Sequence, residues 1–104
     1  YWGPGLNEEL YKLSLRAELR LRGLHNETEL PLPLLYKGET VGESLRLDVL
    51  VEKRVVVELK VVKELLPVHE AQLMTYMRLM GCRVGLLFNF NSVKLMDSFR
   101  RIVL

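Results

Sequence analysis

Two successive apolar segments of the chain each carry a charged pair in their interior. Arg46 and Asp48 lie within "LRLDVLV", and Glu58 and Lys60 lie within "VVVELK". Strand side chains alternate between two faces, so a three-residue turn over 52–54 puts all four charges on one face. That turn places Asp48 opposite Glu58 and Arg46 opposite Lys60. Like charges that face each other are unfavourable unless something compensates them. The opposite face is then continuously apolar and consists of Leu45, Leu47, Val49, Val51, Val55, Val57, Leu59 and Val61.

Two arrangements would compensate these charges. A diagonal network, with Asp48 near Lys60 and Glu58 near Arg46, is neutral and purely structural. Alternatively, a divalent cation lies between the two carboxylates, because hard oxygen ligands are those that Mg²⁺ or Mn²⁺ accepts. Lys60, two residues after Glu58 and on the same face, would then lie beside the water bound to the metal. The charges alone leave both arrangements open.

A helix that begins at Pro67 adds polar residues to this picture. Proline is typical of a first helical position, "VHEAQLMTYMRLM" follows it, and Gly81 ends the helix. Gln72 and Tyr76 are one turn apart and either satisfy each other at the surface or line the cleft of the carboxylates. A histidine in the first turn, here His69, is more typical of a cap or a packing residue than of a catalytic one.

The first helix is predicted from "GPGLNEEL" to about Arg22, with Gly23 as its end. At 3.6 residues per turn its apolar residues form two groups, so one covers the sheet and the other needs a second cover. The first group is Leu6, Leu10, Leu13, Ala17 and Leu21, and the second is Tyr11, Leu15 and Leu19. On the flank between them, Lys12, Arg16 and Arg20 form an i, i+4 stripe that is either a solvated edge or a contact for nucleic-acid phosphates.

The remaining segments complete one mixed sheet. Residues 25–44 contain Pro31 and Pro33 and predict an edge strand and a hairpin. "RVGLLFNF" predicts a further buried strand, and the tail from Ser92 is ambiguous. The order helix, three strands, helix, strand predicts an α/β fold in which helices flank the sheet. A chain of 104 residues fits a single domain over 1–104.

Composition excludes few functions. The net charge of +2 is too small to require a polyanionic partner by itself. The single Cys82, expected as a buried small side chain, allows no internal disulfide, and no apolar run reaches the roughly 18 residues of a membrane span. We therefore expect a reduced, cytoplasmic protein with no membrane association.

Several motifs in order along the chain resemble the PD-(D/E)XK nuclease superfamily and, within it, the small prokaryotic group of GxxExxY proteins. "GLNEELY" matches the name motif of that group through Gly5, Glu8 and Tyr11. Asp48 matches the isolated first acid, and "ELK" matches the (D/E)XK element. "PVHEAQLMTYMRL" resembles the following helix, and "GLLFNFN" resembles the next strand.

The resemblance implies a restriction-endonuclease-like αβββαβ core with a mixed central sheet. It also implies that Glu8, Asp48 and Glu58, together with the Leu59 carbonyl, bind Mg²⁺ or Mn²⁺. Lys60 would orient or activate the attacking water and stabilise charge on the phosphate. Gln72 and Tyr76 would position the phosphodiester.

The expected function is therefore that of a metal-dependent nuclease acting on DNA in preference to RNA. The small scaffold leaves little surface to grip a duplex, so we expect a homodimer or a protein partner at Leu10, Leu13, Ala17 and Leu21. A nucleic-acid-binding or assembly module that keeps the fold without cleaving is the alternative. A purely structural domain with a charge network is the third interpretation.

Overall fold

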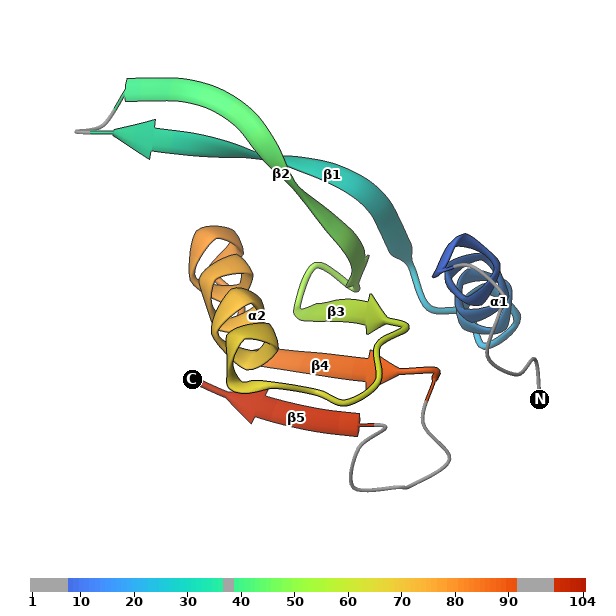
Figure 1. Ribbon diagram of the computed structural model, residues 1–104. Helices are drawn as coiled ribbons and strands as arrows, with labels where there is room; N and C mark the ends of the chain where they lie inside the picture. Colours follow the sequence, from blue (N-terminus) through green and yellow to red (C-terminus); the bar gives the residue numbers. More distant parts are fainter. Residues whose placement is uncertain (1–7, 37–38, 92–98) are drawn as a thin grey trace.

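The computed structural model of the chain describes residues 8–36, 39–91 and 99–104. Figure 1 shows their helices and strands, which follow one another in the order α1, β1, β2, β3, α2, β4, β5. The elements are α1 (Glu8–Leu21), β1 (Asn26–Tyr36), β2 (Glu39–Val51), β3 (Val55–Lys60), α2 (Pro67–Met80), β4 (Val84–Asn89) and β5 (Phe99–Val103). The described helices include none that is long and apolar enough to cross a membrane.

The described strands form one mixed five-stranded sheet in the order β1-β2-β3-β4-β5. The neighbours β3 and β4 are parallel and α2 connects them, whereas the other neighbouring pairs are antiparallel. The predicted mixed sheet flanked by helices is confirmed. The prediction missed β5, which pairs with β4 at the edge of the sheet. Its residues alternate between exposed and half-buried positions, so "FRRIV" carries too weak an apolar signal to stand out.

The two helices cover opposite faces of the sheet. Val56 of β3 packs in a buried cluster with Leu73 of α2. The next residue, Val57, packs in a second cluster with Leu15 and Leu19 of α1. Because adjacent strand residues point to opposite faces, α1 and α2 lie on either side of β3. The apolar side of α1 that was expected to cover the sheet does so.

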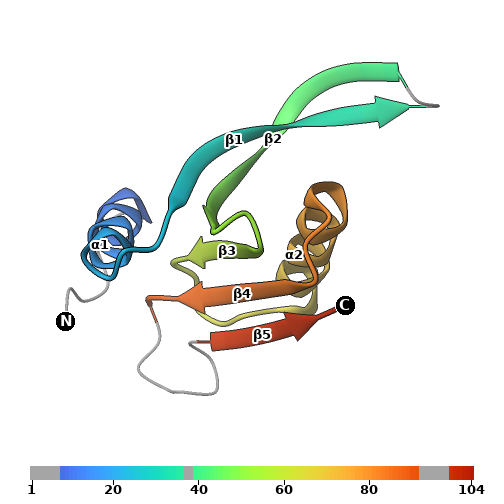
Figure 2. The ribbon, with the colours of Figure 1, turned by 180° about the vertical axis from the view of Figure 1, so that it is seen from behind.

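The strands β1 and β2 form a long ribbon that leaves the rest of the sheet, as Figures 1 and 2 show from opposite sides. The ladder between β2 and β3 begins at the Val51–Val55 pair, which confirms the predicted three-residue turn, and ends at Val49 and Val57. The predicted pairing of Arg46 with Lys60 is therefore wrong. Beyond Val49 the ribbon twists away from β3, and Pro31 of β1 is the ladder partner of Arg46.

The alternation of β2 is interrupted where it separates from β3. Leu47 and Val49 were expected on one apolar face, but Leu47 packs in the cluster with α2 and Val49 in the cluster with α1. Between them, Asp48 has no ladder partner on β1, and the residue it would face, Glu29, has a left-handed backbone with φ 54°. The irregular backbone around Asp48 thus lies at the point where β2 diverges from β3.

Candidate active site

Asp48 and Glu58 bridge the gap between the diverging strands. The Leu59 amide donates a hydrogen bond to Asp48 Oδ2 over 3.0 Å, and the Asp48 amide donates one to Glu58 Oε1 over 3.4 Å. The two side chains therefore satisfy backbone groups that the ladder no longer pairs. This exchange holds the two carboxylates together, although the predicted ladder pair of Asp48 with Glu58 is not formed.

The negative charge of this pair is poorly compensated. Glu58 is only 4% exposed, and burial, followed by the charge of Asp48, raises its pKa to about 8. Burial also raises the pKa of Asp48, although the hydrogen bond from the Leu59 amide opposes the shift. Buried acids of this kind are typical of functional sites, where a cation or a proton completes the charge balance.

Lys60 joins the carboxylates to α2. Its Nζ lies 4.0 Å from Glu58 Oε2 and donates a hydrogen bond to Gln72 Oε1 over 3.2 Å. Because a lysine only donates, the Gln72 amide presents its oxygen to Lys60 and its nitrogen to the Tyr76 hydroxyl, 2.8 Å away. Tyr76 is buried, and its pKa is raised by burial and then by the charge of Glu58. Gln72 and Tyr76 do satisfy each other, but not at the surface, because Tyr76 is buried and the pair continues the polar line from Glu58 through Lys60.

The diagonal network between the two strands is not formed as predicted. Arg46 donates to the Glu29 carbonyl over 3.4 Å and lies on the exposed side of the ribbon. Glu58 has Lys60 near it instead. Lys60 on β3 is therefore the cation that pairs with Glu58, and the charges of Lys12 and Lys60 both oppose the raised pKa of Asp48.

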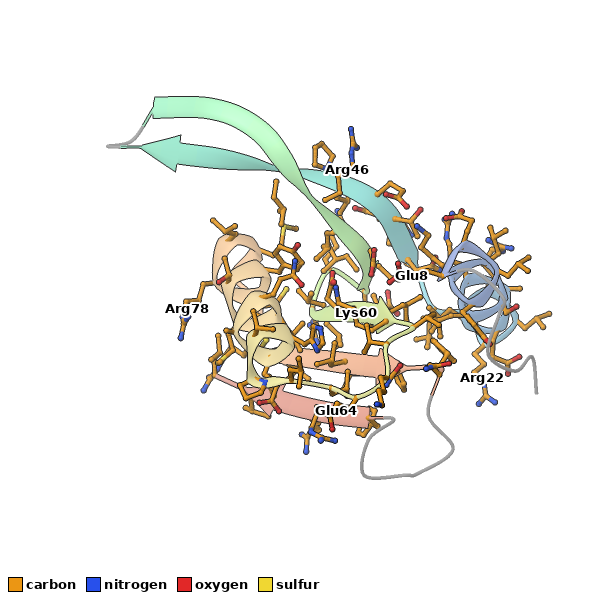
Figure 3. The ribbon with its side chains drawn as sticks, viewed as in Figure 1. Glu8, Arg22, Arg46, Lys60, Glu64 and Arg78 are labelled. Atoms are coloured by element: carbon orange, nitrogen blue, oxygen red, sulfur yellow. The ribbon has the colours of Figure 1, made fainter. Side chains whose placement is uncertain are left out.

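Glu8 reaches the site from the first residue of α1. Figure 3 shows it directed from α1 towards the region of Lys60. Burial raises the pKa of Glu8, and the charge of Asp48 raises it further. Among the described residues, however, no three His, Cys, Asp or Glu side chains are grouped closely enough to hold a metal ion. The structure thus brings Asp48 and Glu58 together, and Glu8 approaches them without completing a compact ligand group.

The donor chemistry nevertheless fits a hard divalent cation. Asp48 and Glu58 contribute carboxylate oxygens to a buried position of excess negative charge, which such a cation would neutralise. Asp48 Oδ2 and Glu58 Oε1 each accept a single backbone hydrogen bond, and a carboxylate has about four acceptor positions. Capacity for ligation therefore remains on both groups.

The predicted stripe of solvated cations on α1 is only partly present. Lys12 is buried and forms ion pairs with Glu9 and Glu29. The Nε of Arg16 donates to Asn26 Oδ1 over 2.7 Å, and Arg20 is exposed. The expectation of three exposed cations is wrong for Lys12, because its ammonium turns inward to acidic partners. Contact of the stripe with nucleic acid stays a prediction.

Two packing contacts near the site were not predicted, although Tyr11 itself was identified as a motif residue and as part of an apolar side of the first helix. Tyr11 stacks on Phe90 with ring centroids 4.4 Å apart, which fixes the turn of α1 that follows Glu8. The buried Asn89 side chain accepts from the Val62 amide and donates to the Val62 carbonyl, which fixes the chain just after Lys60. The i, i+3 spacing of Glu8 and Tyr11 is a usable signal for the first, since both lie on one helix side.

Two further expectations concern residues outside the site. His69 accepts a hydrogen bond from the Leu66 amide at its Nδ1 over 2.9 Å, so it caps the first turn of α2 as expected. Cys82 is buried among the core residues, also as expected.

Comparison with known proteins identifies a superfamily for the chain. A family model described as the PD-(D/E)XK nuclease superfamily matches residues 1–102. No curated protein and no solved structure matches the chain significantly. The family match spans all the motifs from Glu8 to Tyr76, and the observed mixed sheet is consistent with the expected restriction-endonuclease-like fold. The match does not distinguish the GxxExxY group from the rest of the superfamily.

Proposed function

The chain belongs to the PD-(D/E)XK nuclease superfamily, and we propose that it hydrolyses phosphodiester bonds of DNA at the Asp48–Glu58 pair. One observation carries this proposal. A buried carboxylate, Glu58, and a half-buried one, Asp48, are hydrogen-bonded to backbone amides and lie beside a lysine that α2 holds through Gln72. Burial raises the pKa of both acids despite the nearby lysines, so a bound cation would offset negative charge that the protein offsets only in part.

The proposed activity depends on Mg²⁺ or Mn²⁺. Asp48 and Glu58 would hold the ion, with the Leu59 carbonyl and Glu8 as further ligands. When bound, the ion supplies Lewis-acid stabilisation of the charge that develops on the phosphate and activates water. Because the ion offsets the charge of the carboxylates, we expect both to be ionised in the loaded protein.

Lys60 is proposed to orient the attacking water and to stabilise charge developing on a phosphate oxygen. The Gln72 hydrogen bond restricts its ammonium to a position near Glu58, so the donor is held in place before the substrate binds. Tyr76 fixes the Gln72 amide in turn. In this role Gln72 and Tyr76 orient Lys60 and the phosphodiester.

The proposed partner surface is the exposed apolar side of α1. Leu10, Leu13 and Leu21 are exposed, Leu21 to 82%. Such residues on one helix side favour contact with a second copy of the chain or another protein. A partner at this surface would enlarge the area that grips DNA, and the exposed Arg20 on the same helix is the proposed phosphate contact.

A second candidate function is nucleic-acid binding without cleavage. It is favoured by the absence, among the residues described, of a compact group of three metal-ligating side chains. A module of this kind would bind nucleic acid equally well in a chelator. The nuclease, in contrast, requires the divalent ion for cleavage.

The test is cleavage of single- and double-stranded DNA, and of RNA, in Mg²⁺, in Mn²⁺ and in EDTA. The variants are the Asp48→Asn/Glu58→Gln double variant and, as a control, Glu64→Gln at an exposed acid in the loop before α2. We expect metal-dependent cleavage that the double variant loses and the control retains. Equal retention of DNA in a gel-shift assay with and without EDTA, with no cleavage, would favour the second candidate.

A further inference from the structure

A buried lysine lies beside the site. Lys12 is 7% exposed, whereas lysines are almost never buried unless they are paired. It has two partners: Nζ lies 3.1 Å from Glu9 Oε2 on the same helix and also pairs with Glu29 Oε1 on β1. The Lys12–Glu29 pair therefore joins the first turns of α1 to the strand next to Asp48.

The backbone of Glu29 is unusual for a strand. Its φ of 54° lies in the left-handed region, which is sterically unfavourable for a residue with a side chain. Both Glu29 and Asp48 are skipped in the ladder between β1 and β2, although their neighbours pair in register. A conformation of this kind persists only where its surroundings hold it, and such positions cluster at functional sites.

Lys12 is also close to the proposed ligands. It follows Glu8 by four residues, so the two side chains are neighbours on one side of α1. Its partner Glu29 lies on β1 between Thr28 and Leu30, which pair with Val49 and Leu47 on either side of Asp48. Lys12 thus connects the helix side that carries Glu8 with the strand position across from Asp48.

We propose that Lys12 and Glu29 are positioning residues of the active site. Their ion pair holds the first turn of α1 against β1, so that Glu8 is presented to Asp48 and the metal can be bound by both. This inference rests on the proposed metal-dependent function. It assigns to Lys12 a role different from phosphate contact, and it adds a residue, Glu29, that no motif contains.

A second tether between the same two elements provides a matched control. Arg16 on α1 donates to Asn26 on β1, one helical turn farther from Glu8. If any tether of α1 to β1 served equally, loss of the Asn26 acceptor would have the same effect as loss of Glu29. The proposal requires that only the tether beside Glu8 affects metal binding.

The experiment is titration of Mn²⁺ by calorimetry, without nucleic acid, into wild type and the variants Glu29→Gln, Lys12→Met, Lys12→Arg and Asn26→Ala. Thermal melts report whether each variant is folded. We expect Glu29→Gln and Lys12→Met to lower the Mn²⁺ affinity about ten-fold or more, as for residues that orient metal ligands. Lys12→Arg, which keeps the ion pair, should recover part of the loss, and Asn26→Ala should bind like wild type.

The direction in which Lys12→Met and Glu29→Gln change the Mn²⁺ affinity distinguishes a positioning role from an effect of charge alone. Lys12→Met removes a positive charge near the carboxylates and Glu29→Gln removes a negative one, so a purely electrostatic effect would move the two affinities in opposite directions. Opposite shifts, wild-type affinity in both variants, or an equal loss in Asn26→Ala would each overturn the proposal. Glu29 is half exposed, so Glu29→Gln tests it even if Lys12→Met fails to fold.

Failure of the proposed function has a different signature. If wild type and the Asp48→Asn/Glu58→Gln double variant both fail to bind Mn²⁺, the metal site itself is wrong, and the inference is overturned with it. If wild type binds, the double variant does not, and Glu29→Gln binds like wild type, only the role of Lys12 and Glu29 is wrong.

Discussion

At the scale of single residues, the site is defined by two acids whose negative charge the nearby lysines offset only in part. Asp48 and Glu58 accept hydrogen bonds from backbone amides of the opposite strand, yet burial raises the pKa of both carboxyl groups. A metal-free protein therefore holds a proton at Glu58 near neutral pH. This protonation has a measurable effect on stability.

We predict that the free energy of unfolding of the metal-free protein falls as the pH rises. The pKa of Glu58 is about 8 in the folded state, against the ordinary 4.5 of an unfolded chain. Between these two pKa values the folded state binds more protons than the unfolded state. The contribution of Glu58 to the free energy of unfolding is therefore complete below pH 4.5 and is lost as the pH rises through about 8. One proton contributes a slope of at most about 1.4 kcal/mol per pH unit. Urea unfolding in EDTA at several pH values between 4.5 and 8 measures this slope. A Glu58→Gln variant with the same slope as wild type would contradict the assignment of the slope to Glu58.

A second prediction concerns Lys60. Replacing it with methionine removes the proposed donor to the phosphate, so the cleavage rate should fall about 10²–10³-fold. Mn²⁺ affinity should not fall, because a positive charge near the carboxylates is removed. The comparison is with Lys63→Met, at an exposed lysine of the following loop. Equal cleavage by the two variants would exclude a catalytic role for Lys60.

At the scale of elements, α2 must lie close to the sheet for Gln72 to reach Lys60 on β3. Gly85 of β4 provides that close approach, because a Cβ there would overlap Met77 Sδ and lie 3.1 Å from Leu73 Cδ1. We predict that Gly85→Ala lowers the free energy of unfolding by about 1–3 kcal/mol, the usual cost of overpacking a core. Urea denaturation measures this, and wild-type stability would show that α2 can move outward without strain.

Sequence patterns located part of this arrangement and missed part of it. Alternation in "LRLDVLV" and "VVVELK" was sufficient to bring Asp48 and Glu58 together, because the Val51–Val55 pair fixes their register. The divergence of β2 from β3 just beyond that pair depends on how the ribbon twists, which no short pattern encodes. For the same reason Arg46 was predicted opposite Lys60, whereas it lies on the ribbon.

The helix α1 likewise shows what sequence patterns could and could not predict. Its two apolar sides were predicted from periodicity, and Leu15 and Leu19 pack on the sheet as expected. The inward turn of Lys12 and the approach of Glu8 depend on which strand α1 docks against, and that contact is not local in sequence. The edge strand β5 was missed because an exposed strand needs few apolar residues.

At the scale of the whole molecule, the exposed side of α1 is the surface most suited to assembly. We predict that wild type is a dimer in solution and that a Leu13→Glu/Leu21→Glu variant is a monomer, because both leucines are exposed on α1. Light scattering coupled to size exclusion measures the mass. Val68→Glu, at an exposed apolar residue of α2, is the control and should remain dimeric. A monomeric wild type would contradict the proposed self-association.

The account as a whole depends on whether Asp48 and Glu58 bind a divalent ion. The most direct measurement is calorimetric titration of Mn²⁺ into wild type, the Asp48→Asn/Glu58→Gln double variant and the Glu64→Gln control. We predict saturable binding by wild type and the control and none by the double variant. Equal binding by all three proteins, or no binding by wild type, would contradict the proposed metal site and leave the two carboxylates as a structural pair.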